Sequence, residues 1–194
     1  MIIEKGYVYH IDDSYFRLVN DDKLLKNKEN NHYRPNYYAL KDENGLIWAV
    51  PMSSQYEKFE RIYNEKIARY GKCDSIVLGS FDGRQTAFLL QNMFPITDKY
   101  IHHIHTRNNN PVYVNHKYQV EINKKIRKLR ALTQKGYKVV FTDIERLENI
   151  MLQEVAQGQT QAPPSAPAAE PILPNQIPTT GSQGFGGQGF GGLS

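Results

Sequence analysis

Cysteine is almost absent from this 194-residue chain, which contains one, Cys73. A single thiol permits neither an internal disulfide nor a zinc site built on several cysteines, and it is typical of a reducing compartment. No apolar run approaches the ~20 residues that a helix needs to cross a bilayer. The start, Met1 to Tyr7, has no charged leader before an apolar core, so we expect no secretory signal peptide. Together these absences predict a cytoplasmic protein that does not bind membranes.

Basic residues are missing from the end of the chain. Residues 155–194 contain no lysine or arginine and one acidic residue, Glu170, but six of the ten prolines and eight of the fourteen glycines. Gly-Phe-Gly-Gly occurs there at 184–187 and again at 189–192. Such a composition cannot form a core, so we predict a disordered tail. The tail is either an interaction segment that uses its phenylalanines or a dispensable appendage.

The front part, residues 1–154, has the opposite character. It carries all 24 basic residues, all but one of the 20 acidic residues, all 13 tyrosines and the only tryptophan. Its length suits one domain with a single core. A basic, tyrosine-rich surface favours an anionic partner, and nucleic acid is the leading candidate.

Short apolar runs with turn sequences between them predict several strands. Asn44-Gly45 and Asp82-Gly83 each separate two such runs and are typical of β-hairpins. We expect strands at 7–10, 37–40, 46–50, 75–78, 86–90, 100–105 and 138–141.

Helical spacing of apolar residues predicts two long helices. The first spans 56–70 and is closed by Gly71, and the second begins after its N-cap, Asn115, and ends before Gly136. Asp143 begins a short closing helix. Strands and helices in this mixed order, joined by hairpins, favour an α+β fold over a doubly wound parallel sheet.

Motifs of the common enzyme classes are absent. The front part, residues 1–154, has no Gly-x-Gly-x-x-Gly, no Gly-x4-Gly-Lys-Ser/Thr and no Gly-x-Ser-x-Gly, so we expect neither a nucleotide cofactor nor a serine hydrolase. His103 and His105 share one strand face and resemble the beginning of a metal site. We expect no metal, because an acidic third ligand is missing nearby and structural sites need about four ligands. A polar strand face that touches phosphate is the simpler interpretation.

Two features suit contacts with phosphate. The helix at 116–135 carries seven basic residues and one acidic residue, Glu121, and is either a ridge that follows phosphates or an ordinary solvated helix. Ser53 and Ser54 follow a strand that ends at Pro51 and precede a helix. They are either helix caps or part of a phosphate site at the helix N-terminus.

Four segments, in this order, resemble the ToxN/AbiQ/CptN family of type III toxin–antitoxin endoribonucleases. The resemblance covers about residues 7–150, with the basic helix in the expected place, and leaves the tail outside. The segments are Tyr9-His10-Ile11-Asp12-Asp13-Ser14-Tyr15, Tyr33-Arg34-Pro35-Asn36-Tyr37-Tyr38, Trp48-Ala49-Val50-Pro51-Met52-Ser53-Ser54 and Phe88-Leu89-Leu90-Gln91-Asn92-Met93-Phe94-Pro95-Ile96.

The resemblance implies a compact SH3-like β-barrel core with several helices, similar to the MazF and CcdB toxins. It implies metal-independent, sequence-specific cleavage of cellular and phage RNA that leaves 2′,3′-cyclic phosphate and 5′-OH ends. It further implies inhibition by a small structured RNA antitoxin, which the toxin cuts from a repeat precursor and holds in a closed protein–RNA hetero-oligomer.

The resemblance also implies the site. Arg34 stands at the position of a catalytic lysine, Ser53 and Ser54 match a hydroxyl pair, and Tyr15 matches a site tyrosine. Where the family has a second lysine this chain has Tyr56, which leaves the second phosphate-neutralising group open. His10, His32 and His116 are equal candidates for proton transfer. The expected RNA contacts are Tyr33, Tyr56, Lys58, Lys117, Lys124, Lys125 and Lys128.

Two functions of other classes fit the same sequence. One is a non-catalytic RNA-binding module, which shares the salt-dependent binding but cuts nothing. The other is a scaffold protein whose Gly-Phe-Gly-Gly repeats mediate assembly.

Overall fold

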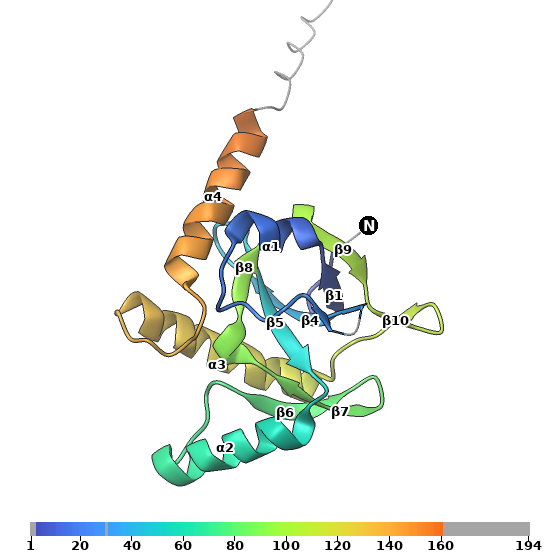
Figure 1. The fold of residues 1–194 in the computed structure, drawn as a ribbon, viewed down its shortest axis with the longest axis vertical. Helices are drawn as coiled ribbons and strands as arrows, with labels where there is room; N and C mark the ends of the chain where they lie inside the picture. Colours follow the sequence, from blue (N-terminus) through green and yellow to red (C-terminus); the bar gives the residue numbers. More distant parts are fainter. Residues whose placement is uncertain (1–2, 30, 161–194) are drawn as a thin grey trace, which may run out of the picture. The chain divides into compact units, whose positions relative to one another are not determined.

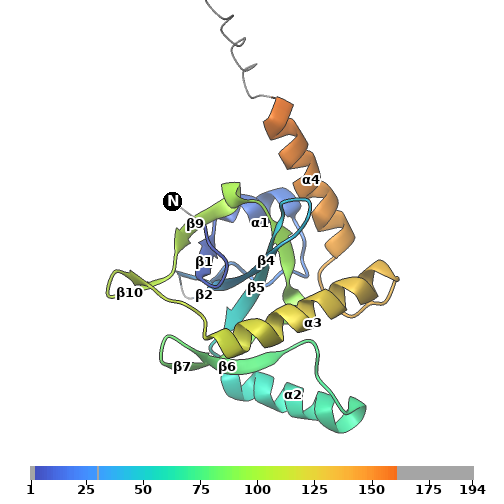
Figure 2. The ribbon, with the colours of Figure 1, turned by 180° about the vertical axis from the view of Figure 1, so that it is seen from behind.

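Seven strands pair into one antiparallel sheet at the centre of the protein (Figures 1 and 2). The computed structural model describes residues 3–29 and 31–160. The strand order is β6-β7-β5-β4-β1-β9, and β8 also pairs with β5. The bounds are β1 Val8–Ile11, β4 Asn36–Lys41, β5 Ile47–Ser53, β6 Val77–Phe81, β7 Arg84–Phe88, β8 Phe94–Ile96 and β9 Ile101–Ile104. Two short strand pairs stand apart from this sheet: β2 Lys28–Glu29 with β3 His32–Tyr33, and β10 Thr106–Arg107 with β11 Asn110–Pro111.

The helices have the bounds α1 Asp13–Val19, α2 Tyr56–Tyr70, α3 His116–Gln134 and α4 Ile144–Thr160, with short 3-10 helices at Leu90–Asn92 and Asp98–Tyr100. The predicted ends of the two long helices are confirmed. Gly71 ends α2 in the left-handed conformation (φ +71°), and Asn115 caps α3 by accepting a hydrogen bond from the backbone N–H of Lys117. Within the described ranges, none of the helices has the length and apolar character needed to cross a membrane.

Strand β5 connects the sheet, and all seven of its residues are buried. It pairs with β4 from Ile47 to Pro51, with β8 from Ile47 to Ala49, and with β7 at Met52 and Ser53. Pro51 stands where the partner changes. Proline has no N–H to donate, but its carbonyl accepts a hydrogen bond from Leu89 (2.9 Å). The end of β5 is thereby directed toward the β6–β7 hairpin.

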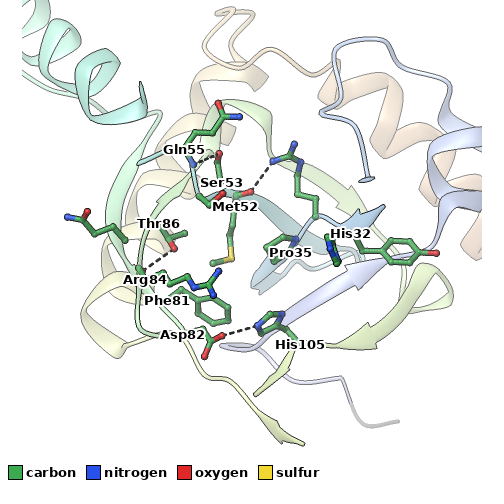
Figure 3. Close-up of a pocket in the computed structure, with 14 residues that line it drawn as sticks. His32, Pro35, Met52, Ser53, Gln55, Phe81, Asp82, Arg84, Thr86 and His105 are labelled. Carbon is green, nitrogen blue, oxygen red and sulfur yellow. Dashed lines mark hydrogen bonds and ion pairs between the residues drawn. The ribbon is translucent and has the colours of Figure 1, made fainter. Parts of the chain in front are cut away.

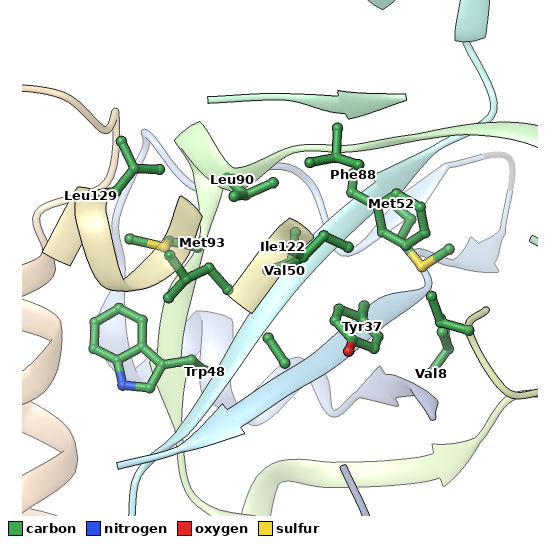
Figure 4. Close-up of a cluster of buried hydrophobic side chains, with 14 of the residues drawn as sticks. Val8, Tyr37, Trp48, Val50, Met52, Phe88, Leu90, Met93, Ile122 and Leu129 are labelled. Atoms are coloured by element: carbon green, nitrogen blue, oxygen red, sulfur yellow. The ribbon is translucent and has the colours of Figure 1, made fainter. Parts of the chain in front are cut away.

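Alternate side chains of β5 enter two different hydrophobic clusters, as the pleat of a strand requires. Trp48, Val50 and Met52 belong to the first, which includes the inner face of α3 (Figure 4). Ile47 and Ala49 belong to the second, which includes side chains of α1 and α4. Each face of β5 is therefore covered by helices.

The α+β class and both hairpins are confirmed, but three expectations need correction. The sheet is not a closed barrel: among the residues described, β6 and β9 end the strand order and do not pair with each other. After the change of partner at Pro51, the β6–β7 hairpin joins the sheet through Met52 and Ser53 and lies at the opposite end of the strand order from β9. The strand expected at 138–141 is a loop, whose Phe141 N–H donates to the carbonyl of Gln91 (2.7 Å).

The closing helix is longer than expected. Helix α4 has 17 residues and continues to Thr160, so residues 155–160, which the sequence assigned to the tail, are helical. Leu147 and Met151 bury its inner face against the second cluster. The rest of the expected tail, 161–194, lies outside the described residues.

A buried carboxylate, that of Asp42, organises the β4–β5 turn. Its side chain is fully buried and accepts hydrogen bonds from the N–H groups of Asn44 and Leu46 and from the Trp48 indole (2.9 Å). Arg130 of α3 pairs with it at 3.1 Å and lies over the Trp48 ring at 4.2 Å. The same guanidinium reaches Glu148 of α4 at 3.3 Å. One arginine thus joins the turn to two helices.

We predict that Arg130→Met destabilises the fold by about 3 kcal/mol, because it leaves the buried Asp42 carboxylate without this cation. Lys128→Met is the matched control, since Lys128 lies on the same helix but its pair with Asp74 is solvent-exposed. Urea unfolding followed by circular dichroism measures both. Equal losses of unfolding free energy for the two substitutions would show that the buried pair stabilises the fold no more than the exposed one.

Candidate active site

A pocket of about 430 Å³ opens where the chain before β4, the end of β5, the β6–β7 turn and the end of β9 meet (Figure 3). Three of the four predicted catalytic residues line it, Arg34, Ser53 and Ser54. The predicted RNA contact Tyr33 lines it too. Residues that lie 20 positions apart in the sequence therefore share one cavity, because β4 and β5 pair beside it.

The Arg34 guanidinium is fixed by backbone carbonyls. Its Nε donates to the carbonyl of Lys26 (3.0 Å) and its Nη1 to that of Met52 (3.2 Å). The backbone N–H of Arg34 donates to Asn27 at 2.6 Å. These contacts hold the positively charged guanidinium at the end of β5.

The two serines differ in exposure. Ser53 is buried, and its Oγ accepts a hydrogen bond from the N–H of Gln55 (3.2 Å), whereas Ser54 is exposed. The residue before α2 is Gln55, so neither serine occupies the N-cap position that the sequence allowed. The hydroxyl of Ser53 keeps its proton for donation, because Oγ is the acceptor in the bond to Gln55.

A second guanidinium, that of Arg84, also lines the pocket, and sequence reasoning missed it. Arg84 follows Asp82 and Gly83, whose positive φ angles (51° and 74°) make the tight turn between β6 and β7. Pairing of β7 with β5 at Ser53 and Ala87 brings this turn to the pocket. The only sequence signal for Arg84 was a basic residue directly after a hairpin turn. That signal does not place Arg84 at the pocket unless the pairing of β5 with β7 is known.

Five of the six histidines gather at one side of the pocket. His10 Nε2 lies 3.1 Å from His105 Nδ1, and the His10 ring stacks on that of His103 at 4.4 Å. Tyr33 stacks on His102 at 5.1 Å. This arrangement follows from the antiparallel pairing of β1 with β9, which places His10 opposite His103.

Burial favours the neutral form of the inner imidazoles. Burial lowers the pKa of His10 from 6.5 to about 4, and the neighbouring His103 and His105 lower it further in the same direction. Burial also lowers the pKa of His103, with His102 adding to the effect. Nowhere between residues 3 and 160, position 30 aside, are three or more metal-binding side chains arranged to hold an ion.

Position separates the three histidines that the sequence left as equal candidates for proton transfer. His32 is exposed and lines the pocket (Figure 3). His10 is buried and bound to His105. His116 begins α3 and does not line the pocket.

Tyr15 does not reach the pocket. Its side chain is fully buried, its hydroxyl donates to the carbonyl of Pro95 (2.9 Å), and its ring stacks on Phe94. Burial raises the pKa of this phenol well above 10, so it is neither a base nor exposed to a substrate. Tyr15 lies in the first turn of α1, and the inward face of that helix packs into the second cluster.

The predicted RNA contacts fall into two groups. Tyr56 and Lys58 line a depression of about 410 Å³ next to the pocket and share Ser54 with it. The α3 lysines do not line the pocket. Lys125 pairs with Glu121 (2.7 Å) and Lys128 with Asp74, whereas Lys124 is exposed and Lys117 lies over the Tyr118 ring at 4.9 Å.

Comparison with solved structures finds proteins of the same fold. AbiQ, a lactococcal anti-phage endoribonuclease belonging to the type III toxin–antitoxin system, matches with a TM-score of 0.57 at 14% identity, over 79% of this chain and 99% of AbiQ. The chain shares the fold of AbiQ. A scan against models of protein families and a search of curated proteins found no match.

Two further structures agree with this likeness. One comes from a bacterial antiviral system that a processed non-coding RNA regulates (TM-score 0.54, 18% identity, 74% of this chain and 95% of that one). The other comes from a bacterial type III system in which a non-coding RNA pseudoknot selectively inhibits the toxin (TM-score 0.57, 18% identity, 82% and 100%). The fold thus agrees with the resemblance to the ToxN/AbiQ/CptN family that the sequence motifs carry.

We predict that Tyr15→Phe leaves every activity of the pocket unchanged and lowers the stability by about 1 kcal/mol, because the buried Pro95 carbonyl loses its hydrogen bond. Thermal unfolding and the RNA-cleavage assay described below measure the two effects. A selective loss of cleavage in a folded Tyr15→Phe protein would restore Tyr15 to the site.

We also predict that the free energy of unfolding falls as the pH is lowered from 6.5 to about 4. Between these values the unfolded chain binds a proton at His10 that the folded chain does not, so acid favours unfolding. His10→Gln weakens this dependence, to which His103 also contributes, whereas His116→Gln, at the exposed start of α3, keeps the parental slope. Urea titrations at several pH values measure it, and equal slopes for the parent and His10→Gln would contradict the assignment.

Proposed function

We propose that this chain is the toxin of a type III toxin–antitoxin system, a metal-independent and sequence-specific endoribonuclease. One observation carries the proposal: two guanidiniums, the hydroxyls of two serines and an exposed imidazole line a single pocket. The fold shared with AbiQ, itself an endoribonuclease, supports the same conclusion. The proposed site consists of Arg34, Ser53, Ser54, Arg84 and His32.

The chemistry that these groups suit is transesterification of RNA. The 2′-oxygen attacks the adjacent phosphorus in line, the bond from phosphorus to the 5′-oxygen breaks, and the products carry a 2′,3′-cyclic phosphate and a 5′-OH. Arg34 and Arg84 stabilise the charge that develops on the phosphoryl oxygens but cannot act as bases. Ser53 and Ser54 donate hydrogen bonds to the same oxygens. His32 accepts the proton of the 2′-OH, and water protonates the leaving 5′-oxygen.

Recognition of RNA is proposed to use the rim of the pocket. Tyr33 and Tyr56 offer rings on which unpaired bases stack, and Lys58 offers a charge for phosphate. Lys117, Lys124, Lys125 and Lys128 of α3 remain proposed contacts of a larger RNA. The two RNA-regulated neighbours support a small structured RNA as the inhibitor. In this proposal the toxin cuts that RNA from a repeat precursor. The RNA then holds the toxin in a closed protein–RNA hetero-oligomer in the cytoplasm, which keeps it from cutting cellular and phage RNA.

The rival function, a non-catalytic RNA-binding module, shares the basic surface but needs no convergence of hydroxyls and guanidiniums. The two differ in one measurable property, since only the toxin produces new RNA ends.

We predict that Arg34→Ala slows cleavage roughly 100-fold or more in excess EDTA, because the phosphoryl oxygens lose a fixed positive charge. Arg69→Ala, an exposed arginine in the last turn of α2, is the matched control and keeps the parental rate. Single-turnover cleavage of a 5′-labelled RNA measures both rates. Thermal unfolding of each variant shows that it is folded.

Cleavage by Arg34→Ala at the rate of Arg69→Ala would remove Arg34 from the site. If the parent itself cuts no RNA but still binds it, the non-catalytic module becomes the correct function.

A further inference from the structure

A second groove, of about 810 Å³, lies between α2, the loop after α3 and the chain after α1. It is lined by four lysines, Lys23, Lys58, Lys66 and Lys138, and by no acidic residue. We call it the lysine groove. Its lining is otherwise apolar or uncharged, so a concave and positively charged surface exists outside the proposed active site.

Aromatic and aliphatic side chains form much of the groove. Phe59, Ile62 and Val140 are half-buried there, and Phe141 is 56% exposed although its backbone is fixed by the hydrogen bond to Gln91. Helix α2 has no fully buried residue, which leaves part of its apolar face open along its length. A large exposed aromatic ring on a fixed backbone, beside an open apolar face, is a surface for contact with a partner.

The lysines are not neutralised by the lining of the groove. Lys66 is held by the hydroxyl of Ser75 (2.7 Å) and the side-chain carbonyl of Gln91 (3.0 Å), both uncharged groups. Lys58 lies over the ring of Phe59 at 5.6 Å, which keeps its ammonium beside an aromatic face. Charge complementarity therefore requires an anionic occupant that also presents flat or apolar groups.

The groove is continuous with the proposed active site. Ser54 and Gln85 line both the pocket and the adjoining depression of about 410 Å³, and Lys58 lines both that depression and the lysine groove. Tyr56 lies in the depression between them. Glu57 also lines this depression, so a strand that leaves the pocket past Ser54 toward Lys58 would pass both Tyr56 and this carboxylate.

We propose that the lysine groove binds an unpaired nucleotide of the same RNA strand that is cut in the pocket. Phosphates of the strand contact Lys58 and Lys138, and the base stacks against Phe141 and Phe59. Proteins that bind single strands commonly combine basic and aromatic side chains in this way. Gln91 and Asn92 line the same groove, and the Gln91 amide oxygen is already bound by Lys66. This inference rests on the proposed function, and continuity with the pocket favours RNA over an acidic peptide.

The test combines a protein variant with an altered RNA. The cut position is first mapped with the parent, and a 2′-deoxy nucleotide is placed there so that binding is measured without cleavage. Fluorescence anisotropy then gives the affinity of the full chain for this RNA and for a series in which one base at a time is removed. Phe141→Ala is compared with Tyr137→Ala, a residue of the same loop that is 60% exposed and does not line the groove.

We expect Phe141→Ala to weaken binding about tenfold, as for loss of one stacked base, and Tyr137→Ala to leave it unchanged. In the RNA series, we expect one nucleotide away from the cut position at which removal of the base lowers the affinity of the parent by the same factor. Removal of that base does not lower the affinity of Phe141→Ala any further. Lys138→Ala lowers the slope of log affinity against log salt by about one. A trinucleotide that spans the cut is cleaved equally by the parent and by Phe141→Ala.

Three outcomes would overturn the inference. Equal affinities of Phe141→Ala and Tyr137→Ala would do so, as would slower cleavage of the trinucleotide by Phe141→Ala. The third outcome concerns a synthetic peptide of alternating glutamate and leucine. If Phe141→Ala weakened binding of this peptide but not binding of RNA, the groove would be a site for a protein. If the parent cuts no RNA, that result contradicts the proposed function rather than this inference. The binding of the base-removal series is then measured with RNA that carries no 2′-deoxy nucleotide.

Discussion

The complete burial of β5 is the constraint on which the rest of the structure depends. Its alternate side chains fill two clusters, so a shift of register by one residue would exchange the contents of both. Its change of partner at Pro51 directs Met52 and Ser53 to the β6–β7 hairpin. The end of this rigid strand therefore becomes one wall of the pocket, and the geometry of the site follows from core packing.

Charge in and around the pocket is distributed unevenly, and this has chemical consequences. The arginines at its rim remain positive at any physiological pH, whereas the buried His10 is neutral because its pKa lies near 4. An anionic backbone is thus attracted to permanent cations. In the proposed mechanism, proton transfer falls to His32, because its side chain is exposed. The lysine groove places four more cations beside α2.

Local sequence signals predicted much of the fold but only part of the site. The turn at Asn44-Gly45 and the ends of α2 and α3 depend on neighbouring residues, so they were predicted correctly. Arg84 and the contact of His10 with His105 depend on strand pairing across the sheet, which no local pattern encodes. Tyr15 shows the converse, since a motif placed it in the site and packing of α1 placed it in the core.

The chemistry of the RNA ends tests the central claim most directly. RNA-free protein is incubated in excess EDTA with a defined RNA that contains the mapped cleavage sequence, and both ends of each fragment are identified by mass spectrometry. The account predicts 2′,3′-cyclic phosphate on one fragment and 5′-OH on the other. Ends with 3′-OH and 5′-phosphate, or cleavage that EDTA abolishes, would contradict transesterification by Arg34, Arg84, the two serines and His32.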